Sequence, residues 1–171
     1  MSGVRQLSGM AASPKVLRVA DVQDLDAINR IIERAIMTWE LPERVKRLSL
    51  PCYRYDEQDL KTGELVVIED RQGCITGVAA WEQAAPRDTP KGYRALQLHG
   101  IYVDPAHQHE GIGGRLILAA EQAAILNGYD GLLVKAQSGA AGFFLAQGMQ
   151  PMDVEDTSRD YTHRYWKPLT R

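Results

Sequence analysis

Cysteine is scarce in this sequence, and long apolar runs are absent. The two cysteines, Cys52 and Cys74, belong to no C-x-x-C pair and are too few for a disulfide framework. Two free thiols are typical of a reducing compartment, so we expect a cytoplasmic protein. No apolar run approaches the roughly 18–20 residues that a membrane helix needs, and the N-terminus lacks the apolar core of a signal peptide. These absences predict no membrane association.

An excess of basic residues is lacking as well. The net charge of −2 argues against a bulk nucleic-acid binder, so we expect no nucleic-acid partner. With 44% hydrophobic and 25% charged residues, the composition is that of a globular protein, which excludes a disordered chain or a collagen. At roughly 150 residues per domain, 171 residues make one domain. We expect a flexible tail over residues 1–14 and a single domain over residues 15–171.

Apolar periodicity predicts both helices and strands. Leu25, Ile28, Ile32 and Ala35 recur at helical spacing after an N-cap signal at Asp21. A strand, a crossover helix and a further strand predict one parallel strand pair in the second half. We expect helices at about 25–37, 42–48, 113–127 and 139–147, an irregular stretch at 51–60, and strands at about 16–20, 64–69, 74–83, 95–103, 132–136, 149–155 and 161–166. The fold class is then mixed α/β or α+β, with about seven strands and about four helices.

Glycine is concentrated in the second half, where nine of the 15 glycines fall between Gly100 and Gly148. In the segment from Val103 to Leu116 a strand ends, the chain turns through glycines, and a helix begins. Helix N-termini offer unpaired N–H groups and the positive end of a dipole, and glycine lets an anion approach them. The segment predicts a phosphate cradle, although it is neither a Walker loop nor a Rossmann fingerprint.

Two motifs in this half resemble the GNAT acetyltransferase superfamily. The spacing Gln108-x-x-Gly111-x-Gly113 is similar to the family's acyl-CoA loop, and it follows a strand and precedes a Leu/Ala-rich helix. Downstream, the segment from Ser138 to Met149 resembles the family's N-x-x-A-x-x-Y-x-x-x-G-F pattern. The resemblance covers about residues 16–167. It implies a mostly antiparallel sheet with a central parallel splay, and acetyl-CoA as the acyl donor, with no metal.

The resemblance also implies which residues hold acetyl-CoA. The pyrophosphate would lie on backbone amides of the glycine loop, and the pantetheine arm would pair with the end of the preceding strand, in the splay. A backbone N–H near Val103 would polarise the thioester carbonyl. The cofactor-binding set implied in this way is Ile101, Tyr102, Val103, Gln108, His109, Glu110, Gly111, Ile112, Gly113, Gly114, Arg115, Ser138 and Phe144.

Acetyl transfer to an amine needs a group that accepts the ammonium proton. Gln97 stands where histone-type members have a glutamate base, and an amide cannot take that role. His99 corresponds to a histidine of arylalkylamine-type members, and positions 97 and 99 share one strand face. His99 is the candidate base or water relay, with Gln97 supporting; the alternative is a histidine held by hydrogen bonds. His107 and His109 could touch phosphate or stand in solvent.

Phe144 stands where the family commonly has a tyrosine that protonates the departing thiolate. A thiol has a pKa near 8.5, so the thiolate can leave and take a proton from water. Tyr102, Tyr161 and Tyr165 are alternative hydroxyl donors. On the acceptor side, aromatic rings could form a cation–π surface or could be core packing. These substrate-binding candidates are Trp39, Tyr53, Tyr55 and Trp81.

Together these features predict an N-acetyltransferase that moves the acetyl group of acetyl-CoA to a primary amine of a small molecule or protein. The amine would attack directly in a ternary complex. The alternative is a non-catalytic CoA or acetyl-CoA sensor of the same fold, because the usual glutamate and tyrosine are both missing. Many family members dimerise, so the resemblance leaves a homodimer open.

Overall fold

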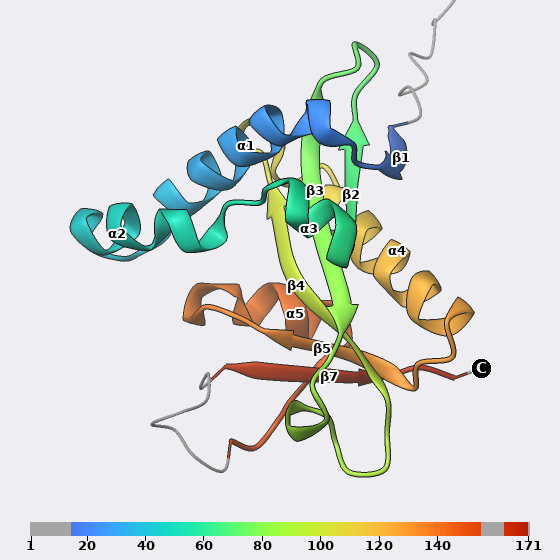
Figure 1. Cartoon of the computed structure of the whole chain (residues 1–171). Coiled ribbons are helices and arrows are strands. Elements are labelled where there is room, and N and C mark those ends of the chain that lie inside the picture. Colours follow the sequence, from blue (N-terminus) through green and yellow to red (C-terminus); the bar gives the residue numbers. More distant parts are fainter. Residues whose placement is uncertain (1–14, 155–162, 171) are drawn as a thin grey trace, which may run out of the picture.

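A seven-stranded sheet organises the computed structural model, which describes residues 15–154 and 163–170. The strand order is β1-β2-β3-β4-β5-β7-β6, and within the described residues every pair is antiparallel except β4–β5. Figure 1 labels β1 to β5 and β7 of this series. Their bounds are β1 Val16–Val19, β2 Glu64–Glu69, β3 Ile75–Gln83, β4 Ala95–Val103, β5 Gly131–Lys135, β6 Gln150–Pro151 and β7 Arg164–Pro168. The expected mixed, mostly antiparallel sheet with one parallel pair is confirmed.

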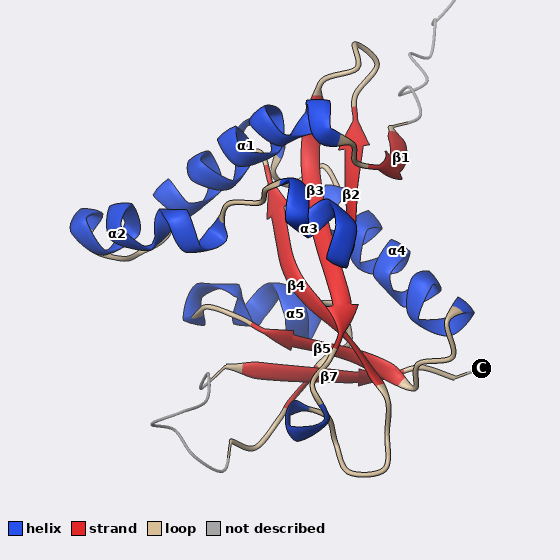
Figure 2. Ribbon diagram, viewed as in Figure 1, coloured by secondary structure: helices blue, strands red, loops and turns tan. Residues whose placement is uncertain are grey.

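Helices cover both faces of this sheet (Figure 2). The core on one face joins α1 to alternate residues of β2 and β3, such as Val67 and Val78, and the core on the other face joins them to α4 through Val66 and Ala79. The alternation follows from the two-residue period of a strand. The helices are α1 Leu25–Met37, α2 Glu43–Tyr53, α3 Glu57–Thr62, α4 Ile112–Leu126 and α5 Ala141–Ala146, and short 3₁₀ turns cover Val22–Asp24, Pro86–Asp88, Pro105–His107 and Ser138–Ala140.

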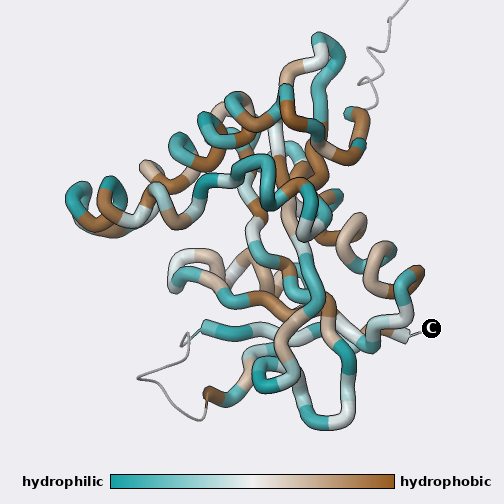
Figure 3. The backbone as a smooth tube through the Cα atoms, viewed as in Figure 1, coloured by the Kyte–Doolittle hydropathy of each residue, from teal (hydrophilic) through white to brown (hydrophobic). Residues whose placement is uncertain are grey.

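The first helix forms as its sequence pattern predicts. Asp21 accepts a hydrogen bond from the backbone N–H of Gln23, and Asp24 accepts one from the N–H of Asp21, so a capping box begins this segment. Ile28, Ile32 and Ile36 are fully buried against the sheet. Figure 3 shows hydrophobic and hydrophilic residues alternating along α1, as in an amphipathic helix.

The stretch at 51–60, expected to be irregular, is largely helical, and the expected helix at 42–48 continues to Tyr53. Pro51 lies within the last turn of α2. A second capping box then begins α3, in which the Asp56 carboxylate accepts N–H bonds from Gln58 and Asp59. The chain therefore has five helices among its described residues, where the sequence predicted about four.

The closing strands are shorter than expected or shifted. The strand predicted at 149–155 is confined to Gln150–Pro151, and the strand predicted at 161–166 is observed as β7, Arg164–Pro168. The residues between them, 155–162, lie outside the described residues, and so does the predicted flexible tail at 1–14.

Two irregularities of β4 shape its C-terminal half. Its parallel pairing with β5 ends at Leu98 opposite Val134, so the two strands part beyond that point. On the other side, Ala80 pairs with Gly100 and Trp81 pairs with Leu98, which leaves His99 as an extra residue in a β-bulge. The expected splay is therefore present, and the bulge sits at its mouth.

Candidate functional site

A cleft of about 1360 Å³ opens where β4 and β5 part. We call one part the loop end, which is lined by residues 101–103, the turn residues Gln108, His109 and Gly111, and the first residues of α4. The other part is the aromatic end, which is lined by Trp39, Tyr53, Tyr55, Glu82 and His99. The cleft thus connects the glycine turn to the aromatic residues that the sequence singled out.

Backbone conformation builds the loop end. Gly111 has φ of +77° and His109 has φ of +64°, two left-handed positions close together in the turn before α4. Such turns direct successive backbone N–H groups to one side. Gly111 caps α4 without any side-chain hydrogen bond, so no capping side chain satisfies the first N–H groups of this helix. A helix N-terminus of this kind binds anions through its N–H groups and its dipole.

Gly113 packs tightly against α5. A Cβ atom at this position would lie 2.9 Å from Cε2 of Phe143, closer than atoms of this kind approach. The absence of a side chain therefore allows Phe143 to pack on the start of α4 beside the cleft. The turn has both the open N–H groups and the close approach that a phosphate group needs, so its residues fit the pyrophosphate of a coenzyme A molecule.

Not all of the predicted cofactor-binding residues line the cleft. Glu110, Arg115 and Ser138 are absent from its lining, and Ile112 is buried in the core, although it borders the cleft. Glu110 forms an ion pair with Lys15 at 2.7 Å, and Arg115 donates to the backbone oxygen of Lys15 at 2.7 Å. The hydrogen bonds from Lys15 and then His107 lower the pKa of the Glu110 carboxyl. These contacts attach the residue at the start of β1 to the loop.

Phe144 lines the cleft but is buried, and its ring stacks on that of Tyr165 at 5.8 Å between centroids. Of the alternative hydroxyl donors, Tyr102 lines the cleft and Tyr165 does not. Tyr161 lies outside the described residues. Among the described residues, the tyrosine of these three that lines the cleft therefore comes from β4 and not from the α5 position that the family pattern indicates.

His99 and Tyr55 meet at the aromatic end. The hydroxyl of Tyr55 lies 3.2 Å from Nδ1 of His99, a hydrogen-bonding distance. Burial, followed by the nearby Tyr102, Asp59 and Glu82, raises the pKa of Tyr55 well above that of a free phenol, so the hydroxyl keeps its proton. Gly100 makes room for this contact, since a Cβ atom there would lie 2.5 Å from the Tyr55 oxygen.

The other aromatic candidates divide into two groups. Trp39 and Tyr53 line the cleft and pack edge to face, with ring centroids 5.5 Å apart. Trp81 does not line the cleft, because it is buried in the core beside α4 and its Nε1 donates to Glu64 at 2.7 Å. The alternation along β3 accounts for this placement, because Ala79 and Trp81 both pack on the α4 side of the sheet.

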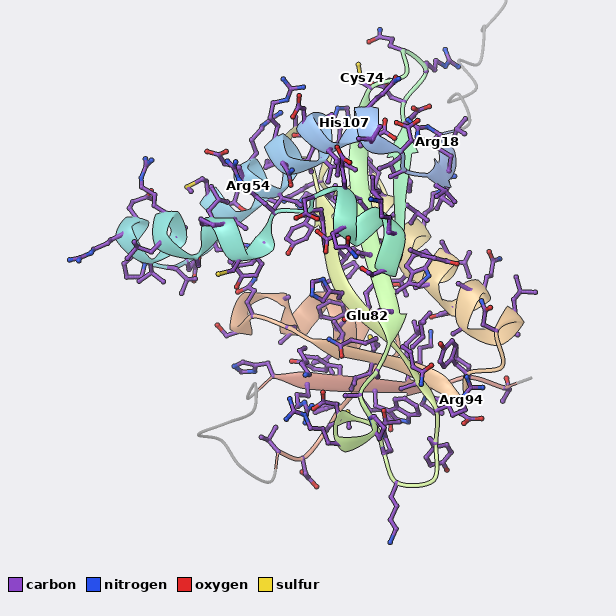
Figure 4. The ribbon with its side chains drawn as sticks, viewed as in Figure 1. Arg18, Arg54, Cys74, Glu82, Arg94 and His107 are labelled. Carbon is purple, nitrogen blue, oxygen red and sulfur yellow. The ribbon has the colours of Figure 1, made fainter. Side chains whose placement is uncertain are left out.

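Charged residues that sequence reasoning missed also line the cleft. Asp88 accepts hydrogen bonds from Lys135, at 2.8 Å, and from Arg164. Burial raises the pKa of Asp88, but these two cations outweigh that effect and hold it below its usual range. Glu82 lies at the end of β3, between α3 and the β5–β7 pair in Figure 4. The sequence did offer a signal for Glu82, because this carboxylate directly follows the apolar run 78–81 of a predicted strand. No local sequence signal marked the Asp88 cluster.

Two properties of the described residues bear on the class of protein. Within these ranges no helix combines the length and the apolar content that crossing a bilayer requires. The same residues bring together no group of three or more histidine, cysteine or carboxylate side chains that could hold a metal ion.

Known proteins share both sequence and fold with this chain. Residues 33–149 match the model of the Acetyltransferase (GNAT) family. A curated relative, the L-methionine sulfoximine/L-methionine sulfone acetyltransferase of Salmonella typhimurium, is 30% identical over 105 residues, which span 59% of this chain and 58% of the relative. The chain thus matches little more than half of the relative's length.

Solved structures extend the likeness to nearly the whole chain. A GCN5-related N-acetyltransferase from Rhodopseudomonas palustris has a TM-score of 0.71 at 22% identity, covering 94% of this chain and 99% of that one. The PaiA N-acetyltransferase of Thermoplasma acidophilum, solved with coenzyme A, has a TM-score of 0.74 at 14% identity, with coverages of 92% and 100%. A GNAT acetyltransferase from Brucella melitensis, solved with acetyl-CoA, has a TM-score of 0.62 at 19% identity, with coverages of 92% and 90%. Because the family model matches more than half of the sequence, the chain belongs to the GNAT acetyltransferase family.

Proposed function

We propose that this protein transfers the acetyl group of acetyl-CoA to a primary amine, by direct attack of the amine within a ternary complex. The observation that carries the proposal is the continuity of the cleft, which joins the loop end to the aromatic end through the opening between β4 and β5. Two substrates that bind at opposite ends of one cleft can meet without a covalent enzyme intermediate.

The residues supply what this reaction needs at each end. Backbone N–H groups at the start of α4 would hold the pyrophosphate, and a backbone N–H near Val103 would stabilise negative charge on the thioester oxygen. The aromatic rings of Trp39 and Tyr53 offer a cation–π surface to the acceptor. The departing thiolate can take its proton from water, so Phe144 is compatible with turnover.

Thiol release from acetyl-CoA, measured across a panel of amines, tests the proposal. The panel includes L-methionine sulfone and L-methionine sulfoximine, for which the Salmonella relative is named, together with alkylamines and lysine peptides. We expect acceptor-dependent release of coenzyme A and a product heavier by one acetyl group. Tight coenzyme A binding without release for any acceptor would contradict the proposal and favour a sensor.

A further inference from the structure

The aromatic end contains a carboxylate that the predicted mechanism does not use. We propose that Glu82 binds the ammonium form of the acceptor and accepts its proton, while His99 positions Tyr55 instead of acting as the base. This proposal rests on the acetyltransferase function proposed above and names the residue that recognises a cationic acceptor.

The register of the sheet brings Glu82 to the reaction centre. Glu82 on β3 pairs with Gln97 on β4, and residues paired across strands present their side chains on the same face. Gln97 is an amide without a basic atom, whereas its cross-strand neighbour is a carboxylate. A second, smaller cavity adjoins the cleft, and Tyr55, Glu82 and His99 are the residues that line both cavities.

The Glu82 carboxylate is available to a ligand. The side chain is exposed, and it forms no hydrogen bond or ion pair with any residue that the structure describes. Its charge nevertheless acts on this centre, because Glu82 is among the groups that raise the pKa of Tyr55, after burial, Tyr102 and Asp59. An ammonium group placed there would gain a charge-assisted hydrogen bond with Glu82 and would neutralise its negative charge.

The charged groups around Glu82 favour a cation. Asp59 of α3 lines the smaller cavity, and Asp88 lines the cleft. Lys135 also lines the cleft, but its ammonium group is hydrogen-bonded to Asp88. The other titratable groups that share a cavity lining with Glu82 at this end carry no positive charge at neutral pH unless His99 is protonated. They are His99, Tyr55, Tyr53, Tyr102, Cys52 and Glu64, and Glu64 accepts a hydrogen bond from Trp81.

The Tyr55 hydroxyl determines which nitrogen of His99 carries a proton. In the proposed arrangement the protonated Tyr55 donates its O–H to Nδ1 of His99, which lies 3.2 Å from the Tyr55 oxygen. A neutral imidazole with Nδ1 as acceptor carries its proton on Nε2. In this tautomer the Nδ1 acceptor of His99 is occupied by Tyr55, so the proposal routes the substrate proton to Glu82.

The proposed step balances in protons and bonds. The ammonium group gives one proton to a Glu82 oxygen, which releases it to water at the open side of the cleft. The neutral amine then forms a C–N bond with the thioester carbonyl carbon, and the C–S bond breaks. The nitrogen loses a second proton by the same route, and the thiolate takes one proton from water. The products are an amide, a thiol and one released proton.

The test is Glu82→Gln with acetyl-CoA saturating and the amine varied between pH 6 and pH 10. We expect kcat/KM for the amine to fall about 100-fold near neutral pH, with KM for acetyl-CoA unchanged. The loss should shrink as the pH rises toward the amine pKa of about 10.4, because free amine then no longer needs a base. Glu57→Gln, an exposed change of the same charge on α3 outside the cleft lining, is the matched control.

His99→Gln separates the two candidate bases, because glutamine keeps hydrogen bonding but cannot accept a proton. We expect it to lose about tenfold at most and to keep the wild-type pH profile. The opposite pattern, a small loss in Glu82→Gln and a lost pH dependence in His99→Gln, overturns the proposal.

A binding measurement keeps the proposal testable even if no turnover is found. The probe is phenethylammonium, titrated by calorimetry into the protein saturated with coenzyme A. We expect equal Kd values for the wild type and Glu57→Gln, and binding at least about tenfold weaker for Glu82→Gln, since a charge-assisted bond is lost. Equal binding by Glu82→Gln, or no binding by the wild type, overturns the ammonium site independently of the proposed reaction.

Discussion

The two ends of the cleft are built from different parts of the chain. Backbone groups form the loop end, where Gly111 adopts a left-handed conformation and Gly113 leaves room for Phe143. Side chains form the aromatic end, and they come from α2, β3 and β4 and from the segments that follow α1 and α2. A ligand at the loop end is held mainly by groups that every residue has, whereas a ligand at the aromatic end meets groups that differ from one sequence to another.

This difference predicts which end can change without loss of the fold. At the loop end a backbone site tolerates most side-chain substitutions, because every residue but proline has an N–H group, but it does not tolerate substitution of the glycines whose conformation or small size it needs. The aromatic end can exchange one side chain for another while its strands and helices stay in place. We therefore expect relatives to share the loop end, whereas the aromatic end should determine which acceptor each relative uses.

The largest expected effect comes from removing Asp88, the carboxylate of the ion-pair cluster that lines the cleft. Asp88→Ala leaves the buried Arg164 and the half-buried Lys135 without the carboxylate that they share. Removing one partner of a buried ion pair destabilises a protein by about 3–5 kcal/mol. Urea denaturation measures this loss, and Glu57→Ala on the exposed side of α3 should change stability by less than about 0.5 kcal/mol. Equal stabilities would contradict a structural role for the Asp88 cluster.

The next largest effect concerns the loop end, which is built from backbone groups. Gly113→Val places branched carbons against the Phe143 ring, which would have to move into the cleft. We expect coenzyme A to bind about 30- to 100-fold more weakly, equivalent to roughly 2–3 kcal/mol, by calorimetry. Gly142→Ala is the control, because a Cβ atom at Gly142 would meet no atom within 4 Å. A normal Kd for Gly113→Val would show that the close approach of α4 and α5 is dispensable.

Acid sharpens the comparison through Asp88, a buried carboxylate whose partners are the two cations Lys135 and Arg164. The two cations hold the pKa of Asp88 lower in the folded chain than in the unfolded chain. The resulting stability is present above the ordinary aspartate value of about 3.9 and is lost as the pH falls through the folded value. The free energy of unfolding should therefore decrease between about pH 5 and pH 2, and Asp88→Asn should decrease less over that range. Identical slopes would assign the acid sensitivity to other carboxylates.

The smallest expected effect concerns the residue where the family pattern has tyrosine. Phe144→Tyr adds a hydroxyl to a buried ring that stacks on Tyr165. Because a thiolate of ordinary pKa leaves without an acid, we expect kcat to change by less than about threefold. Steady-state thiol release measures the change, and a tenfold gain would show that protonation of the leaving group limits this enzyme.

The same division explains what the sequence could predict. The spacing of Gln108, Gly111 and Gly113 identified the loop end, because backbone sites need glycine at fixed positions along the chain. The helix α3 was missed because the aromatic and charged residues at 51–60 suggested an irregular stretch, although the Asp56–Asp59 capping box was present in the sequence. Glu82 was missed because its importance depends on pairing with β4, and sequence periodicity does not reveal register between strands.

The extra residue at His99 changes which residue numbers along β4 face each side of the sheet. Leu96 and Leu98 pack against the α4 side of the sheet, whereas after the bulge Ile101 and Val103 pack on that side and Tyr102 faces the α1 side. Even-numbered positions thus serve one core before His99 and the other core after it. Deleting this residue would restore a regular ladder and would leave Ile101, Tyr102 and Val103 on their present faces, because the pairings on both sides of the bulge already match a regular register. Only His99, the residue of the site, would be lost. An engineer who wishes to move the site to another sheet must therefore transplant an irregularity along with the residues.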